Sequence, residues 1–209
     1  MELSLNSIWE WSKLTLRDPR MASLLAKATQ MPLQASVLII IITGILSGLM
    51  SGMVGVLVPS PPVESLSETA EVMTIEDLGP FILAGLTIFG NLSLMYFVHW
   101  IGAKFDGKGS LSDVAAVTAV LQIVMTVILV GQVAVRLVVP VMYFATVLFG
   151  IFVFLRGLGH AVNVAHDFDD LGKSAMVIGL SFVASVLVAS FVVAILGIGP
   201  ELAMEGSEI

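Results

Sequence analysis

Two histidines and a nearby aspartate in one short stretch of the chain are the side chains best suited to chemistry. The imidazoles of His160 and His166 and the carboxylate of Asp167 are ligand types that divalent metal ions accept in proteins. Their spacing matches no established ligand pattern, and a polar turn between two helices contains such residues in any case. We therefore predict no metal site, and these three residues stay a weak candidate for a metalloenzyme centre.

The remaining sequence contains no recognisable catalytic arrangement. Serine, histidine and acidic residues fall at no triad-like spacing, and neither a glycine-rich phosphate loop nor a His-Glu-x-x-His motif occurs. The absence of cysteine excludes disulfides, thiolate catalysis and iron–sulfur clusters. The net charge of −7 argues against a nucleic-acid partner, because phosphate binding requires clustered lysine and arginine. We predict no catalytic residue, no cofactor and no enzyme activity.

The elements that must carry these residues are dominated by apolar side chains. Hydrophobic residues make up 57% of the 209 residues and charged residues 12%, about half of the roughly 25% usual in soluble domains. The mean hydropathy is +1.03. So few charges cannot cover so much apolar surface in water, and the sequence therefore indicates an integral membrane protein in contact with the lipid bilayer.

Five stretches are long enough to cross a hydrocarbon core of about 30 Å, which requires about 20 apolar residues. Arg136 and Pro140 separate the third stretch from the fourth and favour a tight hairpin, with a four-helix protein that has a kinked middle segment as the alternative. We predict an all-α membrane protein, a five-transmembrane-helix bundle with a short amphipathic N-terminal cytoplasmic arm at 1–33 and an external acidic tail at 199–209. The spans are predicted at about 34–58, 79–103, 114–135, 137–155 and 171–198.

The basic residues predict the orientation of the bundle. With the N-terminus in the cytoplasm, eight of the nine lysines and arginines lie in the inside segments 1–33, 104–113 and 156–173, and only Arg136 lies outside. This asymmetry satisfies the positive-inside rule. Five spans then place the C-terminus outside, and we expect no cleavable signal peptide because the first apolar run begins only near Gln34.

The cytoplasmic arm is predicted to form two short amphipathic helices. Ser7 and Glu10 have the spacing of a capping box for the first helix, and Asp18 followed by Pro19 is typical of the start of a second. The second helix carries a stripe of apolar residues, which are Met21, Leu24, Leu25 and Ala28.

Such an arm would lie at the cytoplasmic interface, where tryptophan side chains are favoured. The residues that we expect to form this interface are Trp9, Trp11, Lys13, Arg17 and Arg20. A plain interfacial anchor is the simplest interpretation. The alternatives are an arm that folds back onto the ends of the spans, a docking face for a partner protein, and a curvature-sensing wedge.

Two features inside the spans predict helix packing. Gly44, Gly48 and Gly52 recur at four-residue spacing in the first span, which is typical of close helix–helix contact in lipid. We favour an internal partner for this face over a homo-oligomer, and self-association through it is a secondary prediction.

The polar residues at membrane depth are Asn91 in the second span and Gln122 and Thr126 in the third. An interhelical hydrogen bond between Asn91 and Gln122 or Thr126 would satisfy them without transport. No Asp, Glu, Lys or Arg lies near the middle of any predicted span, which disfavours proton-coupled transport and voltage sensing. A channel or transporter with Asn91, Gln122 and His160 along its path stays the alternative function.

Three segments, in this order and with this five-span layout, resemble the Yip family of small multispanning proteins, named for interaction with Ypt/Rab GTPases. They are Leu14–Arg20 (LTLRDPR) leading to Met31-Pro32, Gly107–Asp113 (GKGSLSD) leading to Leu121-Gln122, and His166–Phe168 (HDF) before the last span. The short bacterial members, which lack the long hydrophilic N-terminal region of the eukaryotic ones, are the most similar.

This resemblance implies a five-helix membrane domain with a cytoplasmic N-terminus. For eukaryotic members it also implies roles in vesicle trafficking, but a 33-residue arm is too short for a GTPase-binding domain. The hypothesis from the sequence is therefore a non-enzymatic protein of the bacterial inner membrane. It would organise lipid or an unknown protein partner on the cytoplasmic face.

Overall fold

The computed structural model describes residues 4–57 and 79–195, and these residues form helices with no strand among them. The predicted acidic tail at 199–209 lies outside the described residues. Helices α1 (Leu5–Arg17) and α2 (Pro19–Ala28) form the arm. The long helices are α3 (Leu33–Leu57), α4 (Pro80–Lys104), α5 (Leu111–Val138), α6 (Tyr143–His166) and α7 (Leu171–Ile195), with a short 3-10 helix η2 (Pro140–Met142) before α6.

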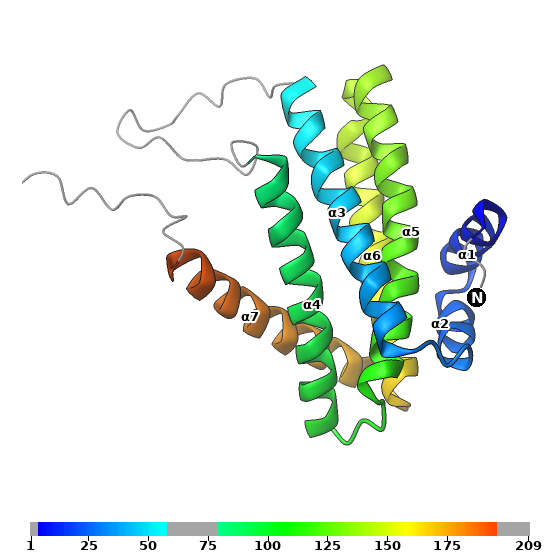
Figure 1. Ribbon diagram of the computed structural model, residues 1–209. Coiled ribbons are helices and arrows are strands. Elements are labelled where there is room, and N and C mark those ends of the chain that lie inside the picture. Colours follow the sequence, from blue (N-terminus) through cyan, green and yellow to red (C-terminus); the bar gives the residue numbers. More distant parts are fainter. Residues whose placement is uncertain (1–3, 58–78, 196–209) are drawn as a thin grey trace, which may run out of the picture.

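Five of these helices, α3 to α7, are long and apolar enough to cross a membrane, which confirms the predicted fold class. In Figure 1, α3, α4, α5 and α6 run beside one another, while α7 leaves their common end at a steep angle. Many large apolar side chains of the bundle face outward, among them Phe152, Phe182 and Phe191. Such a surface is stable only in contact with lipid, so the chain is a multi-pass membrane protein.

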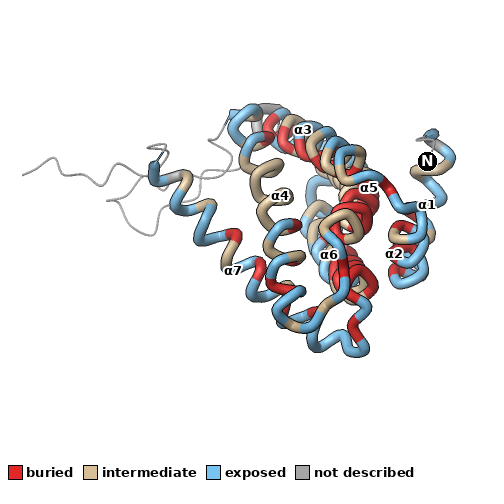
Figure 2. Tube along the Cα trace, turned by 60° about the horizontal axis from the view of Figure 1, so that its bottom comes forward, coloured by how far each residue is buried: buried red, intermediate tan, exposed pale blue. Residues whose placement is uncertain are grey.

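Helix α5 forms the centre of the bundle. It packs against α3 and α6 along the bundle and against both arm helices. Its first half carries the densest run of buried side chains, visible as the red segment of α5 in Figure 2. Small and β-branched residues such as Ala115, Ala119 and Val120 permit this close packing, because they let neighbouring backbones approach.

The boundary between α5 and α6 is a tight reversal, as the hairpin prediction required. Helix α5 ends at Val138, Val139 breaks the helical geometry, and Pro140 starts the 3-10 turn that leads into α6. Proline is suited to this first turn because its missing N–H has no helical partner there. Helix α6 then continues to His166, well beyond the predicted end of the fourth span at residue 155.

The predicted caps of the arm are correct for α2 and wrong for α1. The Asp18 carboxylate accepts a hydrogen bond from the Met21 N–H at 3.0 Å, with Pro19 in the first turn. Helix α1 is capped by Ser4 instead of Ser7, and Ser7 closes the capping box by accepting from the Ser4 N–H at 3.0 Å. Both serines are suitable caps, and the helix starts at the earlier one because this adds a turn of hydrogen bonds.

Candidate functional site

The arm docks on the outside of the bundle against α5 and α6, so it does fold back onto the spans (Figure 1). Its contact face consists of small side chains that are buried, namely Ser12, Thr15, Pro19, Ala22, Ser23 and Ala26. Ser12 and Ser23 donate their hydroxyl hydrogen to main-chain oxygens one turn earlier, so their burial leaves them satisfied. Small residues on this face let the arm lie close to the bundle.

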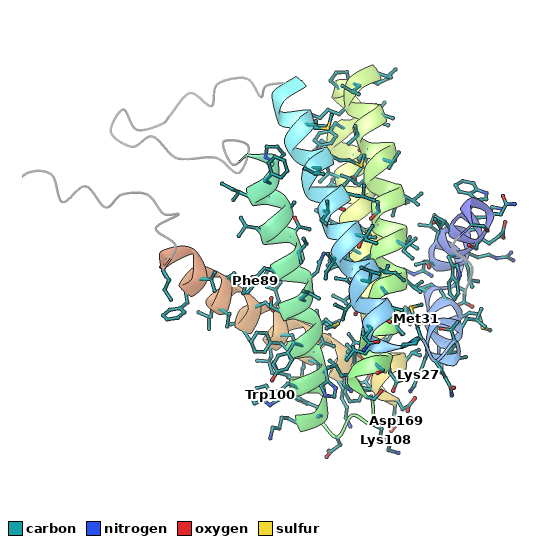
Figure 3. The ribbon with its side chains drawn as sticks, viewed as in Figure 1. Lys27, Met31, Phe89, Trp100, Lys108 and Asp169 are labelled. Atoms are coloured by element: carbon teal, nitrogen blue, oxygen red, sulfur yellow. The ribbon has the colours of Figure 1, made fainter. Side chains whose placement is uncertain are left out.

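Lys27 fixes the end of the arm that leads into α3. Its ammonium group donates to the Asp167 carboxylate at 2.8 Å and to the carbonyl oxygens of Val164 and Ala165 at 3.1 and 3.2 Å. These carbonyls belong to the last turn of α6, where helices leave main-chain acceptors without internal partners and favour positive charge. Figure 3 shows Lys27 at the same end of the bundle as Lys108 and Asp169.

Arg156 fixes the junction between α1 and α2 in the same way. Its guanidinium donates to the carbonyl oxygen of Leu16 at 2.9 Å and lies 3.5 Å from that of Arg17. These are the last carbonyls of α1, so a cation from α6 again completes a helix C-terminus. Two cations therefore hold the arm. Lys27 reaches from the arm to the end of α6, and Arg156 reaches from α6 to the end of α1.

The predicted apolar stripe of α2 points away from the bundle. Met21, Leu24 and Leu25 are 46%, 44% and 45% exposed, and Ala28 is exposed as well. Trp9 and Leu16 of α1 are also exposed. Docking through the small residues and not through this stripe leaves nearly half of each of these large apolar side chains exposed.

The five residues expected at the cytoplasmic interface do not all face outward. Trp9 is exposed, and Lys13 lies 5.5 Å from its ring centre while pairing with Glu10 at 2.8 Å. Arg17 and Arg20 are exposed, whereas Trp11 is half-buried and packs against the hydrophobic core. Trp11 therefore serves to dock the arm.

The glycine face of the first span packs within the chain. A Cβ atom at Gly48 would overlap the main chain of Ala84, and one at Gly44 would lie 2.8 Å from Ile88 Cγ1. Gly52 is packed against Pro80 in the same way. Helix α4 thus occupies this face within the chain, as the preferred internal packing requires.

The polar residues at membrane depth pair with one another. The Gln122 side-chain amide donates to Asn91 Oδ1 at 2.9 Å between α5 and α4, and Thr126 donates to the Gln122 carbonyl within α5. His160 lies on α6, within electrostatic range of Asp18 and Arg20 of the arm. Asn91 and Gln122 therefore satisfy each other within the bundle, while His160 lies on the helix that the arm contacts.

The three residues of the weak metal candidate, His160, His166 and Asp167, do not form a metal site. His166 is fully buried, its Nε2 lies 3.1 Å from the Val98 carbonyl oxygen, and its ring stacks between those of His99 and Phe168. Asp167 pairs with Lys27, and His160 lies six residues before His166 on α6. Within residues 4–57 and 79–195, no three His, Asp or Glu side chains are arranged to hold a metal ion.

Sequence reasoning missed the contacts that surround the last turn of α6 and those that hold the arm against α6. Glycines 102, 107 and 109 surround the last turn of α6, and a Cβ atom at any of them would overlap the His166 ring or the Ala165 carbonyl. From the sequence alone, Lys27 and Arg156 are only charges that indicate the orientation. The one available signal was the repeated glycine in the α4–α5 turn, which indicates a close main-chain approach.

Residues 13–193 match the family model described as the Yip1 domain, so the match includes most of the arm and almost all of α7. Comparisons with curated proteins and with solved structures found no match. The matched range contains all three segments that suggested this family from the sequence.

Proposed function

The chain belongs to the Yip1 domain family, and on this premise we propose that it is a non-enzymatic protein of the bacterial inner membrane that organises lipid. In this proposal the N-terminal arm lies on the cytoplasmic side and inserts into that leaflet. The C-terminus lies outside. The distribution of basic residues supports this orientation through the positive-inside rule.

The observation that carries the proposal is the division of the arm into two faces. Small side chains contact the bundle, and Trp9, Leu16, Met21, Leu24 and Leu25 point away from it. Transfer of half of a large apolar side chain from water into lipid contributes about 1 kcal/mol. Five such side chains therefore favour an arm seated in the interfacial region, with its apolar face among the lipid chains.

Attachment to the bundle gives this insertion a mechanical consequence. Lys27 and Arg156 connect the arm to α6, so the arm displaces lipid in one leaflet at a fixed place beside the spans. Free amphipathic helices would be distributed over the whole membrane surface. A fixed arm instead concentrates the difference in lipid packing between the two leaflets around the protein. This favours local ordering or bending of the membrane.

Binding of an unidentified protein partner by the same arm is the second candidate. The exposed cations Lys13, Arg17 and Arg20 border the apolar face and would meet such a partner. The two candidates differ in what they need, because lipid organisation occurs with the purified protein alone.

The test is the shape of vesicles that contain the purified protein. We expect electron cryo-microscopy to show smaller or more tubular vesicles with the wild type than with the triple variant Met21→Ala, Leu24→Ala, Leu25→Ala. The control truncates three exposed apolar residues of α7 instead, Leu180→Ala, Val183→Ala and Leu187→Ala, and should behave as the wild type. Identical vesicles for the wild type and the arm variant would contradict lipid organisation by the arm.

A further inference from the structure

We propose that a pocket at the end of the bundle remote from Lys27 is filled with water and admits small hydrophilic molecules. The pocket measures about 370 Å³ and lies between α3, α4, α5 and the start of α6. This volume is more than ten times the roughly 30 Å³ that one water molecule occupies in the liquid. Lys27 binds the last turn of α6, whereas Tyr143 at the first turn lines the pocket, so the inference does not rest on the role proposed for the arm.

Polar side chains from all four of these helices line the pocket. They are Ser51 on α3, Thr87 on α4, Gln132 and Arg136 on α5, and Tyr143 on α6. The remaining lining residues are glycine, valine and leucine. Polar groups are costly in contact with lipid, so their convergence on one cavity favours an aqueous content over an acyl chain.

Several of these polar groups have hydrogen-bonding capacity that the protein leaves unused. Among the described residues, the hydroxyls of Ser51 and Tyr143 have no hydrogen-bond partner. The Thr87 hydroxyl and the Gln132 amide each donate one hydrogen to a main-chain oxygen, at 2.7 and 2.8 Å, and retain their acceptor oxygens. Water both donates and accepts, so it satisfies all four side chains, which a hydrocarbon chain cannot do.

Three of these groups lie well below the ends of their helices. Ser51 is six residues before the end of α3, Thr87 seven residues after the start of α4, and Gln132 six residues before the end of α5. At 1.5 Å per residue, each lies about 10 Å from its helix end. A 25-residue helix extends only about 4 Å beyond each side of a 30 Å hydrocarbon core, so these groups lie inside the core.

The entrance of the pocket is polar as well. Arg136 lies two residues before the end of α5 and Tyr143 begins α6, so both lie near the end of the bundle. The Arg136 guanidinium lies 5.1 Å from the centre of the Tyr143 ring. A charged group at this place, whatever its own partners, favours water over lipid chains at the entrance.

The deep end of the pocket is limited by the polar pair of the bundle. Asn91 lies one helical turn beyond Thr87 on α4, and it accepts the hydrogen bond of Gln122 from α5 at 2.9 Å. This bond joins α4 to α5 below the pocket. Water in the pocket therefore reaches to within one helical turn of the Asn91–Gln122 pair.

Cysteine accessibility tests this proposal, since the chain has no cysteine of its own. The full-length protein is placed in lipid vesicles, and the probe is a small, charged methanethiosulfonate on both sides of the membrane, which reacts with thiols in water. We expect Ser51→Cys and Thr87→Cys to react about tenfold or more faster than Gly85→Cys. Gly85 is the matched control, because it lies on α4 nearer the helix start than Thr87 but is exposed on the outer surface, where a Cβ atom meets nothing within 4 Å.

A second change separates the pocket from a general exposure of this end of the bundle. Val133→Phe places a ring in the pocket, so it should slow the reaction of Thr87→Cys several-fold and leave that of Gly85→Cys unchanged. Equal rates at Gly85 and at the two pocket positions, whether low or high, would overturn the proposal, and so would an unchanged rate of Thr87→Cys beside Val133→Phe. Ser51→Cys exchanges a single atom on a different helix, so its rate decides the matter even where another variant does not fold.

Discussion

The ammonium group of Lys27 lies 2.8 Å from the carboxylate of Asp167, 140 positions later in the sequence. Asp167 ends α6 in a left-handed conformation with φ 54°, which turns the chain toward α7. The same ammonium group binds two carbonyl oxygens of the last turn of α6. One side chain of the arm therefore joins the N-terminal segment to the connection between the last two spans.

Lys27→Met is expected to loosen the arm. It removes the charge and three hydrogen bonds at a side chain that is 24% exposed, and a hydrogen bond to a charged group contributes about 1.5–3 kcal/mol when shielded from water. Trypsin cleavage at Arg17 and Arg20 should become faster by about tenfold or more. Lys13→Met is the matched control, because Lys13 and Glu10 are both exposed and such a pair contributes little. Equal cleavage rates in the two variants would show that Lys27 does not hold the arm.

Gly48→Ile is expected to destabilise the bundle by about 3 kcal/mol, since an overpacked contact between two main chains forces them apart. Thermal unfolding in detergent measures the effect. Gly85→Ala on α4 is the matched control, because a Cβ atom there meets nothing within 4 Å and alanine is the better helix former. A Gly48→Ile variant as stable as the Gly85→Ala variant would remove the packing argument.

Asn91 and Gln122 are expected to be coupled in stability. Asn91→Leu leaves the Gln122 amide without the acceptor that it has at 2.9 Å, whereas the double variant Asn91→Leu, Gln122→Leu replaces both groups by apolar ones. Interhelical hydrogen bonds in membranes contribute about 0.6 kcal/mol on average and up to about 1.7 kcal/mol. A double-mutant cycle of unfolding free energies should give a value in this range, and additive effects would mean that the bond contributes nothing.

The spans and their polar pair could be predicted from the sequence because they follow from local rules. Length and hydropathy locate α3 to α7, and the placement of Asn91 and Gln122 at membrane depth requires a partner between helices. Pro140 indicated the turn before α6 for an equally local reason. Physical constraints of the bilayer act on each of these positions separately.

The docking of the arm could not be predicted in this way. The apolar stripe that includes Leu24 is the face of α2 that periodicity identifies, whereas the face against the bundle consists of small residues such as Ala22 and Ala26. The difference arises because lipid is also an apolar solvent, so large apolar side chains need no protein partner. Lys27 and Arg156 meet acceptors more than 130 positions away, and no local pattern identifies those.

The orientation of the bundle is expected to follow the basic residues. The chain has no cysteine, so single variants report one position each. Lys108→Cys in the exposed α4–α5 turn should react with a membrane-impermeant maleimide only after the cytoplasmic side is opened. Val141→Cys, at a residue that is 85% exposed at the other end, should react in intact cells. Labelling of both from the same side would contradict the arrangement of five spans.

The most direct test of the proposed seat of the arm is the environment of Leu24 in a bilayer. A spin label attached to Leu24→Cys reports collisions with oxygen, which concentrates in lipid, and with a water-soluble nickel chelate. Lys108→Cys supplies the aqueous reference and Leu187→Cys the lipid reference. We predict that oxygen collisions dominate at Leu24 as they do at Leu187. Dominant nickel collisions, as at Lys108, would show that the apolar face of the arm lies in water and would contradict the proposed function.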